Sequence, residues 1–273
     1  MDAVKKTAED IKNLKIQCAR SIAIAGLKAI KEVVEESGFK QEFIRACKLL
    51  ESSRPTAVAL YNAIEKIKKQ KSLEEIDKLI YYFENVGSLI AWNGYKLIKN
   101  DYTVLTHCHS SSVVEIFKKA FEKKNKFEVI VTETRPLYQG EKTAKELSRA
   151  GISVIYIDDS APGHFINQVD MLILGIDSIR KEGVVNKIGS YMLSILAKEN
   201  KVPVYFVGET MKLDKRKKFV IEERNPEEVI DPGKLPNVKI ENPAFDVTPW
   251  KYVTAVVTEK GVLKPKQILR MLK

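Results

Sequence analysis

From Thr103 onward, short β-rich runs alternate with amphipathic helical runs, and this alternation constrains the fold more than any other feature of the chain. The β-rich runs predict strands at Thr103–Cys108, Phe127–Glu133, Ile152–Asp158, Met171–Asp177 and Val202–Glu209. Residues 111–124, between the first two runs, carry apolar side chains on one helical face: Val113, Ile116, Phe117, Ala120 and Phe121. Because such alternation forms right-handed βαβ units, it predicts a parallel sheet covered by helices on both faces.

The first 99 residues show helical periodicity and no strand pattern. Helices are predicted around residues 22–33, over Phe39–Leu50, from Pro55-Thr56 onward and over Leu73–Tyr95. At the other end of the chain, a Lys-rich irregular stretch follows Glu209, and further strands are predicted at Ala244–Pro249 and near Thr254–Val257. We therefore predict an α-helical domain over residues 1–99 and a doubly wound α/β domain over residues 100–273.

Composition and charge narrow the class of protein. No apolar run approaches the roughly 20 residues of a membrane span, and the first 15 residues lack the features of a signal peptide. Three cysteines without a pairing pattern indicate reduced thiols and a cytoplasmic protein. The net charge of +10 is spread along the chain without a basic arm. This distribution suits a small phosphate-bearing ligand as well as nucleic acid, and we do not expect a nucleic-acid partner.

Polar or reactive side chains end every predicted strand of the parallel sheet. They are Cys108, Glu133, Asp158, Asp177 and Glu209. Ligands of open parallel sheets bind beyond the carboxyl ends of the strands, so these ends are candidate site positions. Polar residues are also routine where strands meet solvent. The surrounding sequence must therefore decide between the two interpretations.

Cys108 lies in the segment Thr-His-Cys-His-Ser-Ser-Ser, at a predicted strand-to-helix turn. Backbone N–H groups at such a helix start, with the hydroxyls of Ser110, Ser111 and Ser112, predict a phosphate cradle. The same positive helix end favours a thiolate, which would make Cys108 a base or nucleophile. The alternative is a small thiol packed at a strand end. We expect no metal, because alternate strand residues point in opposite directions and Cys108 would face away from both neighbouring histidines.

Other candidate residues lie in later segments. Asp177 ends an apolar strand, and desolvation there would raise the pKa of its carboxyl group and suit a general acid; a helix cap or loop ion pair is the alternative. Arg135, in the loop Thr-Arg-Pro-Leu-Tyr, could clamp a phosphate or form a surface ion pair. Asn186, Lys187 and Lys212 supply further hydrogen-bond donors.

Five of these segments, in this order, resemble the ribose-1,5-bisphosphate isomerases of archaea. They are THCHSSS, VTETRPLYQG, LGIDSIRKEGVVNKIG, GETMK and NPAFDVTP. The wider family includes methylthioribose-1-phosphate isomerases and the alpha, beta and delta subunits of translation initiation factor two-B. The resemblance covers nearly all of the predicted α/β domain. In the predicted N-terminal domain it rests mainly on residues 53–57.

The resemblance implies a helical domain followed by a Rossmann-like domain, in a homo-oligomer that is a dimer or a hexamer. Cys108 matches the catalytic cysteine of the isomerases and Asp177 the catalytic aspartate. Substrate-contacting positions fall on Arg54, Ser110, Ser111, Ser112, Asn186, Lys187 and Lys212. The expected reaction opens a ring-closed ribose 1-phosphate with acid assistance and transfers the C2 proton, without a cofactor. A hydride shift from C2 to C1 is the alternative to this proton transfer. The product of the bisphosphate is ribulose 1,5-bisphosphate, and the link to AMP metabolism leaves AMP open as an activator.

One segment departs from the pattern of these isomerases. Their phosphate-contacting Arg-Gly-Ala segment corresponds here to residues 17–21, Gln-Cys-Ala-Arg-Ser, in which Arg20 would have to substitute from one turn further along. This departure keeps two alternatives open. One is a non-catalytic regulatory subunit like those of translation initiation factor two-B, and the other is a methylthioribose-1-phosphate isomerase. A nucleotide-dependent dehydrogenase is not expected, because no Gly-x-Gly-x-x-Gly follows the first strand.

Overall fold

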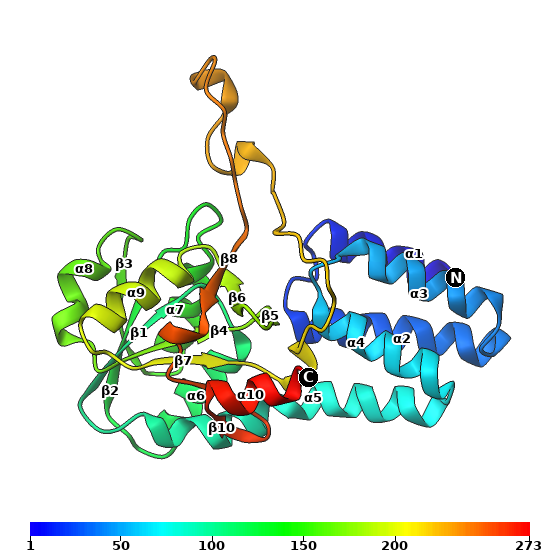
Figure 1. Ribbon diagram of the computed structural model, residues 1–273, viewed down its shortest axis with the longest axis horizontal. Helices are drawn as coiled ribbons and strands as arrows, with labels where there is room; N and C mark the ends of the chain where they lie inside the picture. Colours follow the sequence, from blue (N-terminus) through cyan, green and yellow to red (C-terminus); the bar gives the residue numbers. More distant parts are fainter. The chain divides into compact units, whose positions relative to one another are not determined.

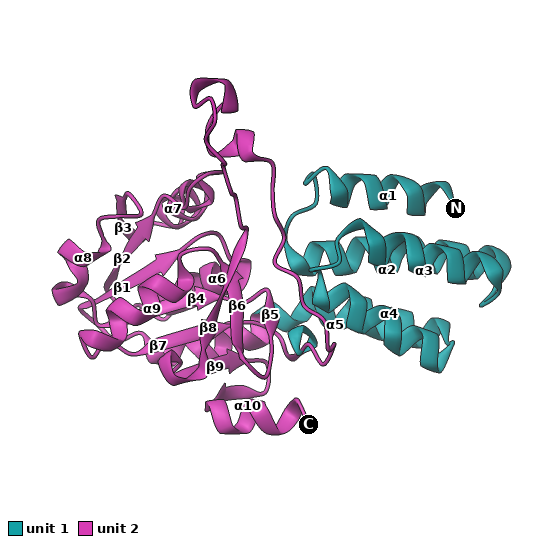
Figure 2. Cartoon of the chain, turned by 45° about the horizontal axis from the view of Figure 1, so that its top comes forward, with its two compact units in different colours: residues 1–87, 211–213 teal, residues 88–210, 214–273 magenta.

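The computed structural model describes all 273 residues and divides into two compact units (Figure 2). Unit 1 comprises residues 1–87 and 211–213, and unit 2 comprises residues 88–210 and 214–273. Helix α5 (Leu73–Gly94) runs through the division. The sequence predicts a boundary between two domains at residue 99. A division into compact units does not test where independently folding domains begin and end, so this boundary stays a prediction. None of the helices is long and apolar enough to span a bilayer.

Unit 1 is helical, as the periodicity of its apolar residues predicts. Its helices are α1 (Asp2–Lys12), α2 (Ala19–Ser37), α3 (Gln41–Ser53), α4 (Val58–Gln70) and the first part of α5. Their apolar faces form one core around side chains such as Ile30, Phe43 and Ile64. The predicted helix start at Pro55-Thr56 is wrong by two residues, because these residues form a turn in which the Ala57 N–H donates to the Arg54 carbonyl.

Unit 2 is built on a seven-stranded sheet with the order β10-β9-β7-β4-β1-β2-β3 (Figure 1). Its strands are β1 (Tyr102–His107), β2 (Phe127–Thr132), β3 (Ser153–Ile157), β4 (Met171–Gly175), β7 (Val204–Val207), β9 (Ala255–Thr258) and β10 (Gly261–Leu263). All neighbours are parallel except β9 and β10. The predicted α/β fold with a mostly parallel sheet is therefore confirmed.

Helices of unit 2 lie between its strands, except the last one, which follows β10. They are α6 (Ser111–Glu122), α7 (Gln139–Arg149), α8 (Pro162–Phe165), α9 (Ser190–Glu199) and α10 (Pro265–Met271). Strand β1 pairs with β2 on one side and with the central strand β4 on the other, so Leu105 lies between Ile130 and Leu172. Burial on both faces explains why these strands are continuous apolar runs.

A second sheet corrects one expectation from the sequence. The predicted strand at Ala244–Pro249 forms β8 (Phe245–Pro249), but β8 does not join the parallel sheet. It pairs in antiparallel fashion with β6 (Gly183–Lys187), which pairs with β5 (Ser178–Ile179). A Cβ atom on Gly183 would lie 2.1 Å from the carbonyl oxygen of Thr248, so only glycine allows this close pairing.

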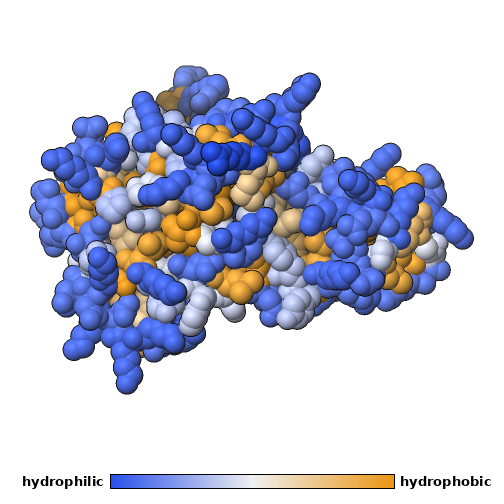
Figure 3. All heavy atoms as spheres, turned by 60° about the horizontal axis from the view of Figure 1, so that its bottom comes forward, coloured by the Kyte–Doolittle hydropathy of each residue, from blue (hydrophilic) through white to orange (hydrophobic).

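Residues 215–244 form an extended segment, which we call the arm, between unit 1 residue Leu213 and β8 (yellow to orange in Figure 1). Only short 3-10 turns interrupt it, at Pro226–Glu228 and Pro232–Lys234. Asp214 anchors its start, because its N–H donates to the carbonyl of Ile179 in β5. On the face in Figure 3, hydrophilic side chains predominate and hydrophobic ones reach the surface in scattered patches.

Candidate functional site

The candidate site lies at the carboxyl ends of β1 and β4. The chain continues from β1 to β2 on one side, whereas β4 lies on the other side of β1, so connections diverge between these two strands. Ligands of open parallel sheets bind at such a divergence. Cys108 follows β1 directly and Asp177 follows β4 by two residues, so the two predicted catalytic residues come from the two strands that flank this point.

Cys108 adopts a left-handed backbone conformation, with φ at 67°. It lies one residue beyond β1 and not within the strand. The strand alternation that was expected to turn Cys108 away from His107 and His109 therefore does not apply to it. A non-glycine residue in this region costs on the order of 1 kcal/mol or more, and such residues concentrate at functional sites. The Cys108 side chain is partly buried, and its Sγ lies 3.6 Å from Oε1 of Gln139.

The protonation state of Cys108 differs from the sequence-based expectation. Burial raises the pKa of its thiol to about 12, the ammonium group of Lys187 opposes this shift, and the carboxylates of Asp177 and Asp159 add to it. The expected thiolate is therefore wrong for the protein without substrate, because the helix start does not offset desolvation. The same shift shows that Lys187 and Asp177 lie close enough to Cys108 to act on its charge.

Asn186 and Lys187 reach this site from β6, the middle strand of the second sheet, and both side chains are about 5% exposed. The amide of Asn186 donates to the Ser190 hydroxyl at 2.8 Å. A Cβ atom on Gly175 would lie 2.8 Å from the Ser110 Cβ and 3.4 Å from the Asn186 Oδ1. Gly175 thus lets β4 pass between these two predicted substrate-binding residues.

The three serines after Cys108 occupy the start of α6. Ser110 precedes the helix with extended backbone angles, and Ser111 is its first residue. The side chain of Ser112 is buried, whereas those of Ser110 and Ser111 are partly exposed. Of the three hydroxyls in the predicted cradle, those of Ser110 and Ser111 are therefore the accessible ones. The helix has 12 residues, so its first turn leaves backbone N–H groups for an anion.

Arg135 is exposed in the loop between β2 and α7, and its guanidinium group already has partners in the protein. It donates to the hydroxyl of Tyr138 and, at 3.0 Å, to the carbonyl of Val229 in the arm. It also lies over the Tyr138 ring. A phosphate clamp formed by Arg135 would have to replace these contacts, and its predicted role stays a prediction.

Three other predicted substrate-binding residues belong to unit 1. Arg20 is the second residue of α2 and is 9% exposed. The guanidinium of Arg54 lies 3.4 Å from the carbonyl of Gln17. Lys212, in the 3-10 turn Thr210–Lys212, is 7% exposed. Full burial is unusual for cationic side chains such as those of Arg20 and Lys212. The contribution of all three residues to substrate binding stays a prediction.

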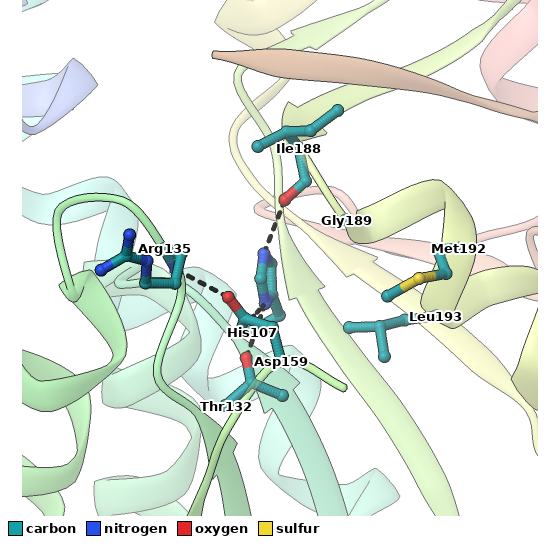
Figure 4. A pocket seen from close by; sticks show the side chains of 8 residues that line it. All are labelled: His107, Thr132, Arg135, Asp159, Ile188, Gly189, Met192 and Leu193. Carbon is teal, nitrogen blue, oxygen red and sulfur yellow. Dashed lines mark hydrogen bonds and ion pairs between the residues drawn. The ribbon is translucent and has the colours of Figure 1, made fainter. Parts of the chain in front are cut away.

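A pocket of about 250 Å³ lies beside Cys108 (Figure 4). It is lined by His107, Thr132, Arg135, Asp159, Ile188, Gly189, Met192 and Leu193. His107 lies at its centre, with Nδ1 2.6 Å from the Thr132 hydroxyl and Nε2 2.8 Å from the Ile188 carbonyl. Because a carbonyl only accepts, Nε2 donates and Nδ1 accepts. Burial lowers the pKa of His107, consistent with this neutral ring.

Sequence reasoning did not single out four neighbours of Cys108. Thr134, Gln139, Thr143 and Asp159 contact Cys108 or the loop that carries Thr134. Thr134 and Gln139 lie in the segment VTETRPLYQG and Asp159 comes just after a strand end, which were the available signals, whereas nothing in the sequence marks Thr143. Across the chain, no group of three or more His, Cys, Asp or Glu side chains is arranged to hold a metal ion.

Comparison with known proteins identifies the family. The model of the initiation factor 2 subunit family matches residues 15–265. This chain belongs to that family. A family member from Archaeoglobus fulgidus, named ribose 1,5-bisphosphate isomerase, is 38% identical over 97% of this chain and 91% of its own length.

Solved structures with the same fold carry two kinds of name. A crystal structure of Pyrococcus horikoshii OT3, described as translation initiation factor eIF-2B, has a TM-score of 0.87 and 32% identity, covering 98% of this chain and 99% of that one. The 5-methylthioribose 1-phosphate isomerase of Pyrococcus horikoshii OT3 has a TM-score of 0.77 and 34% identity, covering 98% and 87%. The initiation factor 2 subunit family thus includes proteins named as enzymes and proteins named as translation factors.

Proposed function

We propose that this protein is an aldose–ketose isomerase that converts ribose 1,5-bisphosphate into ribulose 1,5-bisphosphate. The observation that carries the proposal is the placement of Cys108 and Asp177 just beyond β1 and β4, the two strands between which the connections diverge. The charges of Asp177 and Lys187 both act on the pKa of the Cys108 thiol, which supports their closeness to it. A thiol, a carboxyl group and a cation are the groups that an acid–base isomerisation of a phosphorylated sugar requires. The 38% identity to a protein named ribose 1,5-bisphosphate isomerase supports this substrate.

The proposed reaction begins with ring opening. The 1-phosphate locks the sugar as a ring, so the C1–O bond to the ring oxygen must break. Asp177 donates a proton to that oxygen as the bond breaks. The thiolate of Cys108 then removes the C2 proton, and the electron pair of the C–H bond forms a C1=C2 enol phosphate.

The second half of the reaction regenerates both groups. Cys108 returns its proton to C1, while the C2 hydroxyl loses its proton to the Asp177 carboxylate and becomes the ketone. Atoms, charge and oxidation state therefore balance without an external oxidant. Because burial holds the free thiol protonated, Cys108 must lose a proton once substrate is bound. The positive charge of Lys187 favours that ionisation.

The experiment is a proton NMR assay of the purified protein with ribose 1,5-bisphosphate. Cys108→Ser and Asp177→Asn should each lower kcat by about 10²–10⁴-fold, the usual contribution of one proton-transfer partner. Cys47→Ala removes a thiol buried in the core of unit 1, and Asp158→Asn removes an exposed carboxylate whose partner is Ser160. Both controls should retain kcat. Full activity of Cys108→Ser or of Asp177→Asn would refute the role of that residue.

A second candidate substrate is 5-methylthioribose 1-phosphate, favoured by the 34% identity to the isomerase of that name. The ring opening and proton transfer would be the same, and only the substituent at C5 would differ. Turnover of this sugar but not of the bisphosphate would identify it. Binding of the bisphosphate without turnover of either sugar would instead favour a regulatory subunit.

We further propose a cytoplasmic homo-oligomer, a dimer or a hexamer, with AMP as a candidate activator. Phosphorylated sugars do not cross membranes unaided, which supports a cytoplasmic site of action. Light scattering during size-exclusion chromatography measures the number of subunits. Initial rates with and without AMP test activation, and an unchanged rate at saturating AMP would remove it from the proposal.

A further inference from the structure

All three polar groups of Cys108 contact side chains of one segment, residues 134–143, between the end of β2 and the first turns of α7. Its backbone N–H donates to the hydroxyl of Thr134 at 2.8 Å. Its carbonyl accepts from the hydroxyl of Thr143 at 2.9 Å. Its thiol lies 3.6 Å from Oε1 of Gln139, which can only accept, so the thiol is the donor. One short segment of the chain therefore meets every polar group of Cys108.

The hydroxyl groups of Thr134 and Thr143 hold the backbone of Cys108 on the two sides of its Cα. Thr134 Oγ1 accepts from the Cys108 N–H, and its own proton can go to the Thr132 carbonyl at 3.3 Å or to Nδ1 of His107 at 3.4 Å. Thr143 Oγ1 donates to the Cys108 carbonyl and lies 3.1 Å from Nδ1 of His109, from which it accepts. The Thr143 hydroxyl therefore has one orientation, because the Cys108 carbonyl takes its single proton.

The backbone around this contact is constrained on both sides. Thr134 has φ at 63°, a left-handed conformation that a β-branched residue rarely adopts. Its N–H donates to Oδ1 of Asp159 at 2.8 Å. Cys108 has φ at 67°. Cys108 and Thr134, both in an unfavourable backbone conformation, are thus joined by a hydrogen bond beyond the ends of β1 and β2. Such conformations persist only where the surrounding structure fixes them.

Gly140 allows residues 134–143 to fold back against the end of β2. A Cβ atom on Gly140 would lie 1.8 Å from the carbonyl oxygen of Thr132, which no other residue could tolerate. The Gly140 N–H donates to the Glu133 carbonyl at 3.1 Å. The chain therefore folds back against the end of β2, and this places Gln139 and Thr143 beside Cys108.

We propose that Thr134, Gln139 and Thr143 are positioning residues that fix the direction of the Cys108 thiol toward the substrate. The inference rests on the proposed function, in which Cys108 moves the C2 proton. Proton transfer requires the two heavy atoms within hydrogen-bond reach, and a misplacement of about 1 Å can cost about 10²-fold in rate. Loss of one contact should thus lower kcat and leave KM nearly unchanged, because this proposal assigns none of the three a contact with the sugar.

The test compares Thr143→Val, which removes the hydroxyl at constant shape, with Thr143→Ser, which keeps it. Thr106→Val is the matched control, because the Thr106 hydroxyl is equally buried and donates to the Ile173 carbonyl at 2.8 Å, away from Cys108. Thr143→Val should lower kcat by about 10–100-fold, and Thr143→Ser and Thr106→Val should each remain within about threefold of the wild type.

A readout independent of activity is the NMR signal of cysteine labelled with ¹³C at Cβ. The chain has three cysteines and therefore three signals, and the one missing in Cys108→Ser identifies Cys108. Thr143→Val should move this signal and leave those of Cys18 and Cys47 in place. Thr143→Ser should restore it, and Thr106→Val should not move it.

The outcomes separate this inference from the proposed function. If the wild type shows no turnover but the Cys108 signal moves in Thr143→Val, the isomerase assignment is overturned and the contact between Thr143 and Cys108 is supported. An active wild type whose Thr143→Val variant keeps both its kcat and its Cys108 signal would overturn the positioning role. A loss of kcat in Thr143→Val that Thr143→Ser does not restore would also overturn it.

Discussion

The raised pKa of the Cys108 thiol makes its reaction with iodoacetamide slow and strongly dependent on pH. With a pKa of about 12, roughly one thiol in 10⁴ is ionised at pH 8, against about one in four for an ordinary cysteine. The thiolate fraction is thus lower by about 2,000-fold. A thiolate of higher pKa is intrinsically more nucleophilic, by about 40-fold for this difference. Cys108 should therefore react about 50-fold more slowly than a cysteine peptide.

The assay follows alkylation of the tryptic peptide that contains Cys108 by mass spectrometry from about pH 7 to pH 10. Restricted access could also slow the reaction, but it would leave the pH profile of an ordinary thiol, which levels off near its pKa of about 8.5. Cys108 should instead gain about tenfold in rate for each pH unit throughout this range. A plateau below about pH 9 would refute the pKa assigned here.

A pair of lysine variants tests the cause of the shift. The charge of Lys187 lowers the pKa of Cys108, so Lys187→Met should raise it and slow alkylation further. Lys181 is exposed, and Lys181→Met should leave the rate unchanged. Equal rates in both variants would mean that the ammonium group of Lys187 does not reach the thiol, and the proposed ionisation of Cys108 would lose its support.

Two predictions concern stability. Burial raises the pKa of Asp246 from 3.8 to about 6. The folded protein then binds this proton more tightly than the unfolded chain, so the free energy of unfolding should fall by about 2 kcal/mol as the pH rises from about 4 to 6. Urea unfolding of Asp246→Asn at both pH values should show a smaller fall, and an unchanged fall would contradict the assignment. Asp214→Ala leaves Arg180 without its buried carboxylate, 2.6 Å away, and should cost about 3–5 kcal/mol. Glu182→Gln removes a largely exposed partner of Arg180 and should cost less than about 1 kcal/mol in the same assay.

The parallel strands could be predicted from the sequence because burial on both faces makes each a continuous apolar run. The structure shortens all five predicted strands at the carboxyl end. The sequence predicts Cys108, Asp158 and Asp177 as last strand residues, and all three lie beyond β1, β3 and β4. This difference favours the site, since a side chain beyond the ladder can turn toward a ligand.

The second sheet could not be predicted, for two physical reasons. Strand β5 has two residues, too few for any period to appear. Strand β6 pairs with β8 across about 60 residues, so its local sequence carries no trace of the partner. Asn186 and Lys187 were found through their resemblance to a family motif, whereas their place on β6, and the closeness of Lys187 to Cys108, are products of tertiary structure.

The surroundings of Cys108 were also beyond sequence reasoning. Its contacts with Thr134 and Thr143 span 26 and 35 residues and involve hydroxyl groups that any surface threonine could carry. The helix start that favours a thiolate is local and was found, but desolvation by the whole fold is stronger. The protonation state of Cys108 therefore could not be predicted from the local sequence.

The arm has an evolutionary consequence, because both of its ends are attached to the same small sheet. Asp214 is hydrogen-bonded to β5 at one end, and the other end continues into β8. Insertions or deletions between these anchors alter a loop whose closure entropy changes only slowly with length. Lineages can therefore lengthen or rebuild the arm while Asn186 and Lys187 on β6 keep their places. The arm can therefore change in length and sequence while the residues of the candidate site stay in position.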